Sequence, residues 1–268
     1  MHMSIVTRGS GPPLVLVPGV QGRWEYLRPA IDALAQSFRV ITFALCGERS
    51  SGIRFDSSLG LDNYTNQIAG ALDDLRVDRA VICGISFGGL AALRFAARQP
   101  NRTAALILAS VPGPGWHLRP RHRLYARLPW VLGPLLLVET PFRLWTELAA
   151  ALPRLSDRWR FVGSQLRTLI TAPISLGRMA ERAELLAETD FAASCPHVSA
   201  PTLIVTGERG LDHIVPIEGS LGYASLVRGA RTAALDRTGH LGAITHPDRF
   251  ATLVTEFVRS ISHVGASA

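Results

Sequence analysis

The stretch VICGISFGGLAALRF, residues 81–95, changes its pattern in the middle. Its first part is an unbroken apolar run of the kind that forms a buried strand, and its second part repeats apolar residues at helical spacing. Ser86 stands between the two parts, and the glycines at 84 and 88 remove Cβ atoms that would collide in a tight turn. Such a turn lifts the serine hydroxyl above the edge of a sheet, beside the N–H groups of a helix N-terminus. The stretch therefore predicts a strand–turn–helix unit with Ser86 as a candidate nucleophile.

Five further apolar runs resemble the one that precedes Ser86, and segments with helical spacing lie between most of them. The six runs span residues 13–18, 38–45, 79–85, 103–110, 201–207 and 231–236. Nearly continuous apolar runs are typical of strands that are buried on both faces of a parallel sheet. Strands that alternate with helices imply right-handed βαβ units. We therefore predict an α/β fold, a mostly parallel twisted sheet with helices on both faces, with a core made of residues 1–110 and 201–268.

Residues 111–200 interrupt this alternation. They have helical composition, several prolines and no convincing strand, and they are too long for a single crossover helix. We therefore predict that 111–200 are an inserted helical cap. Within it, residues 111–182 hold 11 Arg and 4 acidic residues, whereas the rest of the chain is neutral, so this segment carries the whole net charge of +7. The insertion also holds four of the five Trp residues.

Composition excludes several classes of protein. The 268 residues are 47% hydrophobic, which suits one large α/β domain with an insertion. Cys46, Cys83 and Cys195 have no paired spacing, so they suggest neither a disulfide framework nor a metal site, and they fit a reducing compartment. The N-terminus lacks the apolar core of a signal peptide, and the apolar patch at 128–138 is too short to span a bilayer. We expect a cytoplasmic protein.

The strand–turn–helix unit at Ser86, the alternation of strands and helices, and the acidic and histidine residues that follow later in the chain make this sequence resemble the α/β-hydrolase superfamily. The resemblance is to its serine hydrolases with a helical cap. GISFGG at 84–89 is similar to the nucleophile elbow of that family. The resemblance covers nearly the whole chain and is weakest in 111–200. It implies that the catalytic residues follow one another in the order serine, acid, histidine.

A neutral serine hydroxyl needs a base to take its proton. The best candidate is His240 in DRTGHLGA, just after the last predicted strand, where similar family members carry Gly-His. Five other histidines are weaker candidates, and three of them, His117, His122 and His197, lie in or beside the insertion. His246 begins the C-terminal helix and more readily serves as a cap, and His213 is the neighbour of the candidate acid.

The base in turn needs a carboxylate that fixes its tautomer. PTLIVTGERGLDHIVP supplies Asp212, in a pattern similar to the Gly-x-x-Asp-x-x-x-Pro of the family with one extra residue in the loop. Glu208 and Asp236 compete with it, but Glu208 follows the strand immediately and Asp236 ends the last strand. We favour Asp212. No Asp or Glu occurs from 79 through 138, which excludes an acid after the strand that ends at Ser110.

The resemblance also implies an oxyanion hole made of two backbone N–H groups, those of Phe87 and Val20. Val20 lies in the turn Pro18–Gly22 after the first predicted strand, where the family usually has His-Gly and this chain has Pro-Gly. The hole should survive because its donors are main chain, but the hydrogen bonds that usually steady this turn must be replaced. A second departure places Ala44 and Cys46 at positions that are usually polar, and we interpret Cys46 as a packed structural cysteine.

The resemblance implies a serine hydrolase that cleaves a carboxylic ester, thioester or lactone with an apolar acyl or alcohol part, without metal or cofactor. C–C bond hydrolysis and cofactor-free perhydrolysis use similar triads and remain alternatives, as does a non-enzymatic small-molecule receptor on the same fold.

The Leu, Trp, Phe and Pro residues of the cap predict an apolar cavity over the site. Its Arg excess can be an ordinary solvated face, which we favour, an attractor of anionic substrates, or a contact with an anionic membrane surface. No motif predicts nucleic acid binding. The oligomeric state stays open.

Overall fold

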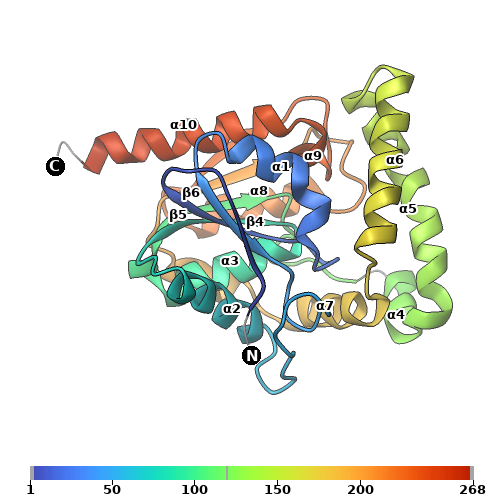
Figure 1. Cartoon of the computed structure of the whole chain (residues 1–268), viewed down its shortest axis with the longest axis horizontal. Coiled ribbons are helices and arrows are strands. Elements are labelled where there is room, and N and C mark those ends of the chain that lie inside the picture. Colours follow the sequence, from blue (N-terminus) through green and yellow to red (C-terminus); the bar gives the residue numbers. More distant parts are fainter. Residues whose placement is uncertain (1–2, 119, 266–268) are drawn as a thin grey trace.

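The computed structural model describes residues 3–118 and 120–265, and within them the chain forms one seven-stranded sheet flanked by helices (Figure 1). The strand order is β1-β3-β2-β4-β5-β6-β7, and all neighbours are parallel except β1 and β3. In chain order the strands are β1 (Ile5–Arg8), β2 (Pro13–Val17), β3 (Arg39–Phe43), β4 (Ala80–Ile85), β5 (Thr103–Ala109), β6 (Thr202–Thr206) and β7 (Arg231–Ala234). The predicted α/β fold is confirmed.

The two edges of the sheet differ from the prediction. All six predicted strands are present, but β7 is not buried on both faces, because it is an edge strand and most of its residues are exposed. At the other edge, β1 pairs antiparallel with β3. The sequence did not predict β1, because it has only four residues and none of them is buried.

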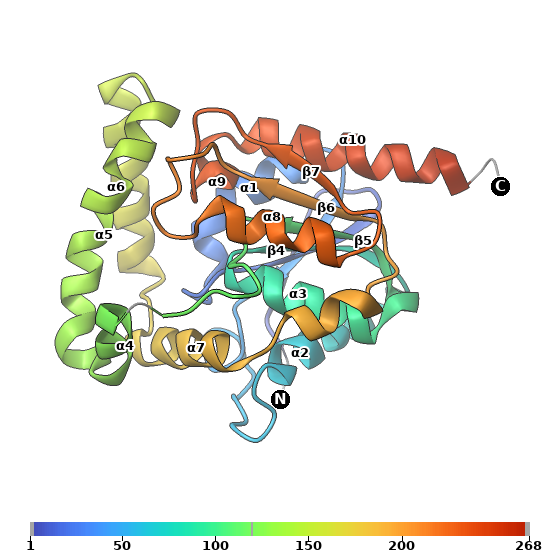
Figure 2. The same ribbon diagram turned by 180° about the vertical axis from the view of Figure 1, so that it is seen from behind.

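Helices cover both faces of the sheet (Figures 1 and 2). On one face lie α1 (Arg28–Leu34), α9 (Gly242–Thr245) and α10 (Pro247–Gly265), together with the short helix η1 (Trp24–Leu27). On the other face lie α2 (Asp62–Asp74), α3 (Phe87–Arg98) and α8 (Ile217–Leu226). The apolar stripe of α10 packs on the sheet through Phe250, Val254 and Phe257, all buried. Within the described residues no helix is both long and apolar enough to cross a bilayer.

Residues 111–200, which we call the cap segment, leave the sheet after β5 and return at β6. Their helices are α4 (Pro120–Arg127), α5 (Pro129–Ala151), α6 (Leu155–Thr171) and α7 (Leu176–Glu188), followed by the short helix η3 (Ala192–His197). Apart from Arg119, which lies outside the described residues, the segment contains no strand. Both ribbon views show α5 and α6 side by side, standing beside the sheet, while α4 and α7 lie across one end of the pair (Figures 1 and 2).

The sheet has one point at which the chain changes direction. Chain connections run from β2 to β3 toward one edge and from β4 to β5 toward the other, while β2 and β4 are neighbours. In open α/β sheets, ligands bind in the crevice outside the carboxyl ends of the strands at such a switch point. The segments that follow β2 and β4 are the turn Pro18–Gly22 and Ser86, so the fold brings both to this crevice.

Candidate active site

Ser86 stands on a sharp, strained turn between β4 and α3. Its φ is 54°, in the left-handed region that non-glycine residues rarely adopt. A Cβ atom at Gly84 would lie 2.3 Å from the carbonyl oxygen of Gly88, and one at Gly88 would lie 2.3 Å from the carbonyl oxygen of Val17. The steric role predicted for both glycines is confirmed. The Ser86 N–H donates to the Ala109 carbonyl at 2.9 Å, which ties the turn to β5.

His240 and Asp212 meet at the carboxyl edge of the sheet. His240 Nδ1 lies 3.3 Å from Asp212 Oδ2, and their side chains are 14% and 2% exposed. The other carboxylate oxygen of Asp212 accepts the N–H groups of Ile214 at 2.9 Å and Val215 at 2.7 Å. These bonds fix the carboxylate so that one oxygen remains for the imidazole.

The competing acids point elsewhere. Glu208 Oε2 accepts the backbone N–H of Arg237 at 2.8 Å. Asp236 is exposed and forms an ion pair with Arg249 at 3.1 Å. Asp212 is therefore the carboxylate of the three that contacts His240.

The turn after β2 lies against the elbow. The N–H of Gly22 donates to the carbonyl of Gly19 at 2.9 Å and closes the turn that contains Val20. A Cβ atom at Gly19 would lie 3.5 Å from the Cβ atom of Ser86. Phe87 is the first residue of α3, and the N–H groups of a first helical turn have no partner within the helix.

Arg182 of α7 holds this turn in place. The residue is fully buried, and its Nη1 donates to the carbonyl of Val20 at 3.1 Å while lying 2.7 Å from Glu48 Oε1. Its Nη2 donates to the carbonyl of Cys46 at 3.3 Å. Gly22 has a φ of 73°, and a Cβ there would lie 2.3 Å from Nη1 of Arg182, so the guanidinium in this position needs a glycine at 22. Arg182 supplies hydrogen bonding for a loop whose usual histidine is replaced by proline.

Glu147 of α5 holds the loop that carries His240. Its carboxylate is fully buried and accepts three consecutive backbone N–H groups, those of Gly239 at 2.8 Å, His240 at 3.0 Å and Leu241 at 2.6 Å. A buried carboxylate needs such donors, because an unpaired buried charge is very costly. The cap segment therefore contributes a second carboxylate beside the imidazole.

The charges around His240 raise the pKa of its imidazole and favour its protonated form. Burial acts to lower the pKa of His240, but the hydrogen bond and charge of Asp212 and the charge of Glu147 outweigh it, and the net pKa is raised. Burial also raises the pKa of Glu147, although the N–H groups of Leu241 and Gly239 oppose this shift. Burial raises the pKa of the Cys46 thiol to about 12, despite the nearby Arg182, which fits an unreactive packed cysteine.

Sequence reasoning missed Glu147, Arg182 and Glu48. Glu147 and Arg182 lie in helices and Glu48 lies in the loop after β3, and in neither setting does a single charged residue give a signal in the sequence that it is buried. The one available hint was the Pro18 departure, which required another group to hold the turn.

The Leu, Trp, Phe and Pro residues of the cap segment are predicted to make an apolar cavity over the site, and this prediction is wrong for three of the tryptophans. Trp130, Trp145 and Trp159 are 75%, 41% and 61% exposed, because the apolar faces of α5 and α6 turn outward. Two cavities open beside the Asp212 loop instead, and neither is lined by Ser86 or His240. One of about 440 Å³ is lined by Phe142, Arg143, Thr146, Asp212, His213 and Pro216. The other, of about 510 Å³, is lined by Gly113, Gly115, Trp116, His117, Ile214, Pro216, Glu218 and Gly219.

The chain is similar to known enzymes over nearly its full length. The model of the alpha/beta hydrolase family matches residues 14–253. A pimeloyl-(acyl-carrier protein) methyl ester esterase from Aromatoleum aromaticum is 30% identical, covering 88% of this chain and 92% of that protein. A 2-hydroxymuconate semialdehyde hydrolase from Pseudomonas sp. strain CF600 is 29% identical, covering 93% and 88%. Among solved structures, the enol-lactonase from Burkholderia xenovorans LB400 has a TM-score of 0.73 at 22% identity and covers 96% of each chain.

Proposed function

Because this chain belongs to the alpha/beta hydrolase family, we propose that it is a serine hydrolase that cleaves a carboxylic ester, thioester or lactone through an acyl-enzyme. The observation that carries the proposal is the contact between His240 Nδ1 and Asp212 Oδ2, at the sheet edge to which the elbow delivers Ser86. A serine, a histidine and a carboxylate in this arrangement can move one proton and form one covalent bond.

The hydrogen bonds that His240 already makes decide which of its ring nitrogens can act as the base. Nδ1 of His240 faces Asp212, so Nε2 is the nitrogen left to take the hydroxyl proton of Ser86. The serine oxygen then attacks the acyl carbonyl, and the imidazolium returns the proton to the leaving alcohol or thiol. Water repeats the sequence: His240 takes its proton, the hydroxide oxygen attacks the acyl carbon, and Ser86 leaves with the proton.

The tetrahedral intermediate needs donors for its oxyanion. We assign them to the backbone N–H groups of Val20 and Phe87, since the turn after β2 lies against the elbow. Losing one such donor costs about 3 kcal/mol of transition-state stabilisation. Metal and cofactor have no part in this sequence of steps.

The relatives narrow the substrates to test. The esterase relative is named for a methyl ester of an acyl-carrier protein, and an acyl ester is the first class we assign to this chain. C–C bond hydrolysis with the same triad is the second candidate, favoured by the similarity to a 2-hydroxymuconate semialdehyde hydrolase.

A fluorophosphonate probe tests the proposal directly. Native protein should be labelled and Ser86→Ala should not be, with both variants folded by circular dichroism. A panel of p-nitrophenyl esters from acetate to palmitate, lactones, a carrier-bound methyl ester and a semialdehyde substrate then ranks the substrate classes. Absence of labelling in the folded native protein would favour the receptor alternative.

A further inference from the structure

We propose that two buried charged residues of the cap segment, Glu147 and Arg182, are positioning residues that hold the two catalytic loops on either side of Ser86. Glu147 holds the loop of the base, and Arg182 holds the loop of the oxyanion donor. The inference rests on the proposed function of those loops.

The Glu147 carboxylate is matched to the backbone it binds. Oε1 accepts the N–H groups of Gly239 and Leu241, and Oε2 accepts the N–H of His240 itself. Three donors converge on two oxygens, so the ionised form fits this site, and a protonated carboxyl would set an O–H against an N–H. Because Glu147 is fully buried, water does not compete for these donors. The backbone from which the imidazole projects is therefore fixed by the cap.

The same turn of α5 also holds the loop of the acid. Arg143 Nη2 donates to the carbonyl of His213 at 2.9 Å, and Thr146 Oγ1 lies 3.0 Å from His213 Nε2. His213 directly follows Asp212. A single helical turn, residues 143–147, thus contacts the loops that carry both the acid and the base.

Glu147 also acts on His240 through charge. Two carboxylates act on the imidazole from different elements, Asp212 from the loop after β6 and Glu147 from α5, and both favour the protonated form. Removing the Glu147 charge should therefore make the imidazole a weaker base, in addition to loosening its loop. A role confined to packing would not move the titration of His240.

The test compares Glu147→Gln with Glu147→Asp and with Glu139→Gln, which removes the same charge from the same helix at an ion pair with Arg121. In Glu147→Gln an amide NH₂ replaces one of the two oxygens and leaves at least one N–H of residues 239–241 without its acceptor. We expect kcat to fall about 10–100-fold, the loss typical of residues that orient a metal ligand through a hydrogen bond. KM should change less than about twofold, and the acid limb of the kcat/KM profile should shift to lower pH. Glu147→Asp keeps the charge, so its acid limb should stay in place. Glu139→Gln should match the native protein.

Hydrogen exchange of the amides at 239–241 gives a second readout that is independent of turnover. Glu147→Gln should lose protection there, whereas Glu139→Gln should keep it. Unchanged exchange and an unchanged acid limb in Glu147→Gln would overturn the role proposed for Glu147 while leaving the hydrolase assignment intact. Failure of the native protein to react with fluorophosphonate would instead contradict the proposed function. If Glu147→Gln does not fold, the exchange and pH profile of Glu147→Asp decide, because shortening the side chain must weaken protection if the carboxylate is the clamp.

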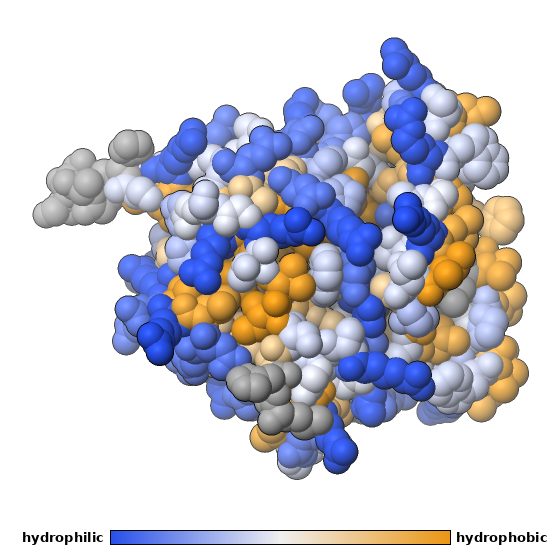
Figure 3. Space-filling view, viewed as in Figure 1, coloured by the Kyte–Doolittle hydropathy of each residue, from blue (hydrophilic) through white to orange (hydrophobic). Residues whose placement is uncertain are grey.

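A different observation carries a second proposal. The outward sides of α5 and α6 expose ten large apolar side chains, which we call the outer face, and Figure 3 shows hydrophobic residues along that edge of the molecule. Its members are Trp130, Val131, Leu135, Val138, Phe142, Trp145, Leu155, Trp159, Leu166 and Ile170. Patches of this kind mark interaction sites.

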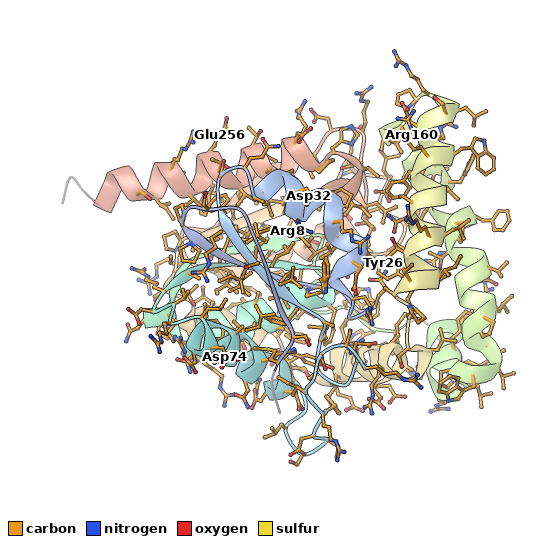
Figure 4. The ribbon with its side chains drawn as sticks, viewed as in Figure 1. Arg8, Tyr26, Asp32, Asp74, Arg160 and Glu256 are labelled. Atoms are coloured by element: carbon orange, nitrogen blue, oxygen red, sulfur yellow. The ribbon has the colours of Figure 1, made fainter. Side chains whose placement is uncertain are left out.

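We infer that the outer face docks on an anionic lipid surface. Exposed arginines at 127, 154, 160 and 167 lie on or next to α5 and α6, and Figure 4 shows Arg160 on α6. The acidic residues of α5 and α6 balance only part of this charge, since Glu147 is buried, Glu139 is paired with Arg121, and Asp157 pairs with Arg160 alone. Arginine and tryptophan together suit the boundary between lipid headgroups and acyl chains.

Co-sedimentation with phosphatidylcholine vesicles, with and without phosphatidylglycerol, tests this inference. The native protein should bind only the anionic vesicles and should be released by high salt. Phe142→Glu and Ile170→Glu should each weaken binding at least about tenfold, and Leu59→Glu, at an exposed leucine outside the cap segment, should not. Absence of binding to anionic vesicles overturns the inference. The inference is also overturned if light scattering shows a dimer that Phe142→Glu dissociates, because the outer face would then bind a second copy of the chain. It is overturned as well if Phe142→Glu lowers only the turnover of a carrier-bound ester and leaves vesicle binding unchanged.

Discussion

The two sides of the cap segment place charge in opposite settings. On the inner side, Glu147 and Arg182 are fully buried, and each binds the backbone of a loop for which we propose a catalytic role. On the outer side, arginines such as Arg160 are exposed among apolar side chains. A buried charge must be fully bonded and so fixes geometry, whereas an exposed charge is screened and replaceable. The net charge of the segment hides this division, and the two sides should respond differently to substitution.

The largest effect should come from the carboxylate that the inner side helps to position. Asp212→Asn should lower kcat about 10⁴-fold without unfolding the protein, because the imidazole loses the partner that fixes its tautomer. Glu208→Gln and Asp236→Asn should stay within about twofold of the native protein, since those side chains are engaged elsewhere. Steady-state kinetics on a soluble ester measure all three. A large loss in Glu208→Gln alone would contradict the assignment of the acid.

Breaking the inner ion pair should cost far more stability than breaking an outer one. Arg182→Leu leaves Glu48 buried without its partner, so the free energy of unfolding should fall by about 3–5 kcal/mol. Arg160→Gln removes an exposed pair with Asp157 and should cost less than about 1 kcal/mol. Urea denaturation compares the two variants. If both variants lost the same free energy of unfolding, the ion pairs on the inner and outer sides of the cap segment would not differ in the way described.

The pH dependence of turnover should report the negative charge around His240. The imidazole must be neutral to take the proton of Ser86, and its pKa is raised above the ordinary value of 6.5. Activity should therefore be present at alkaline pH and lost as pH falls through a midpoint above 6.5. The acid limb of kcat/KM measures this midpoint. A midpoint below the ordinary value would show that burial outweighs the two carboxylates.

The smallest effect is expected on the outer face. Trp159→Ser removes a side chain that is 61% exposed, so the free energy of unfolding should change by no more than about 0.5 kcal/mol. Turnover of a soluble ester should stay unchanged. A large loss in either measurement would mean that Trp159 packs against the core or the substrate.

Features that depend on residues close together in the sequence could be predicted, and contacts between residues far apart could not. The elbow around Ser86 is a local pattern, and the glycines at 84 and 88 predict it. The family resemblance supplied His240 and Asp212, and the structure brings these two together. Glu147 could not be predicted, because its partners lie 92 to 94 residues away and are backbone groups without a sequence signature. Arg182 reaches Val20 across 162 residues for the same reason.

We propose that residues far apart in the chain form one proton path at the elbow, and a crystal structure of the fluorophosphonate-treated protein tests this most directly. We predict phosphorus bonded to Ser86 Oγ, the phosphoryl oxygen accepting the N–H groups of Val20 and Phe87, and Nε2 of His240 within hydrogen-bonding distance of the adduct. An adduct on another side chain, or an imidazole turned away with a different group in its place, would contradict the account.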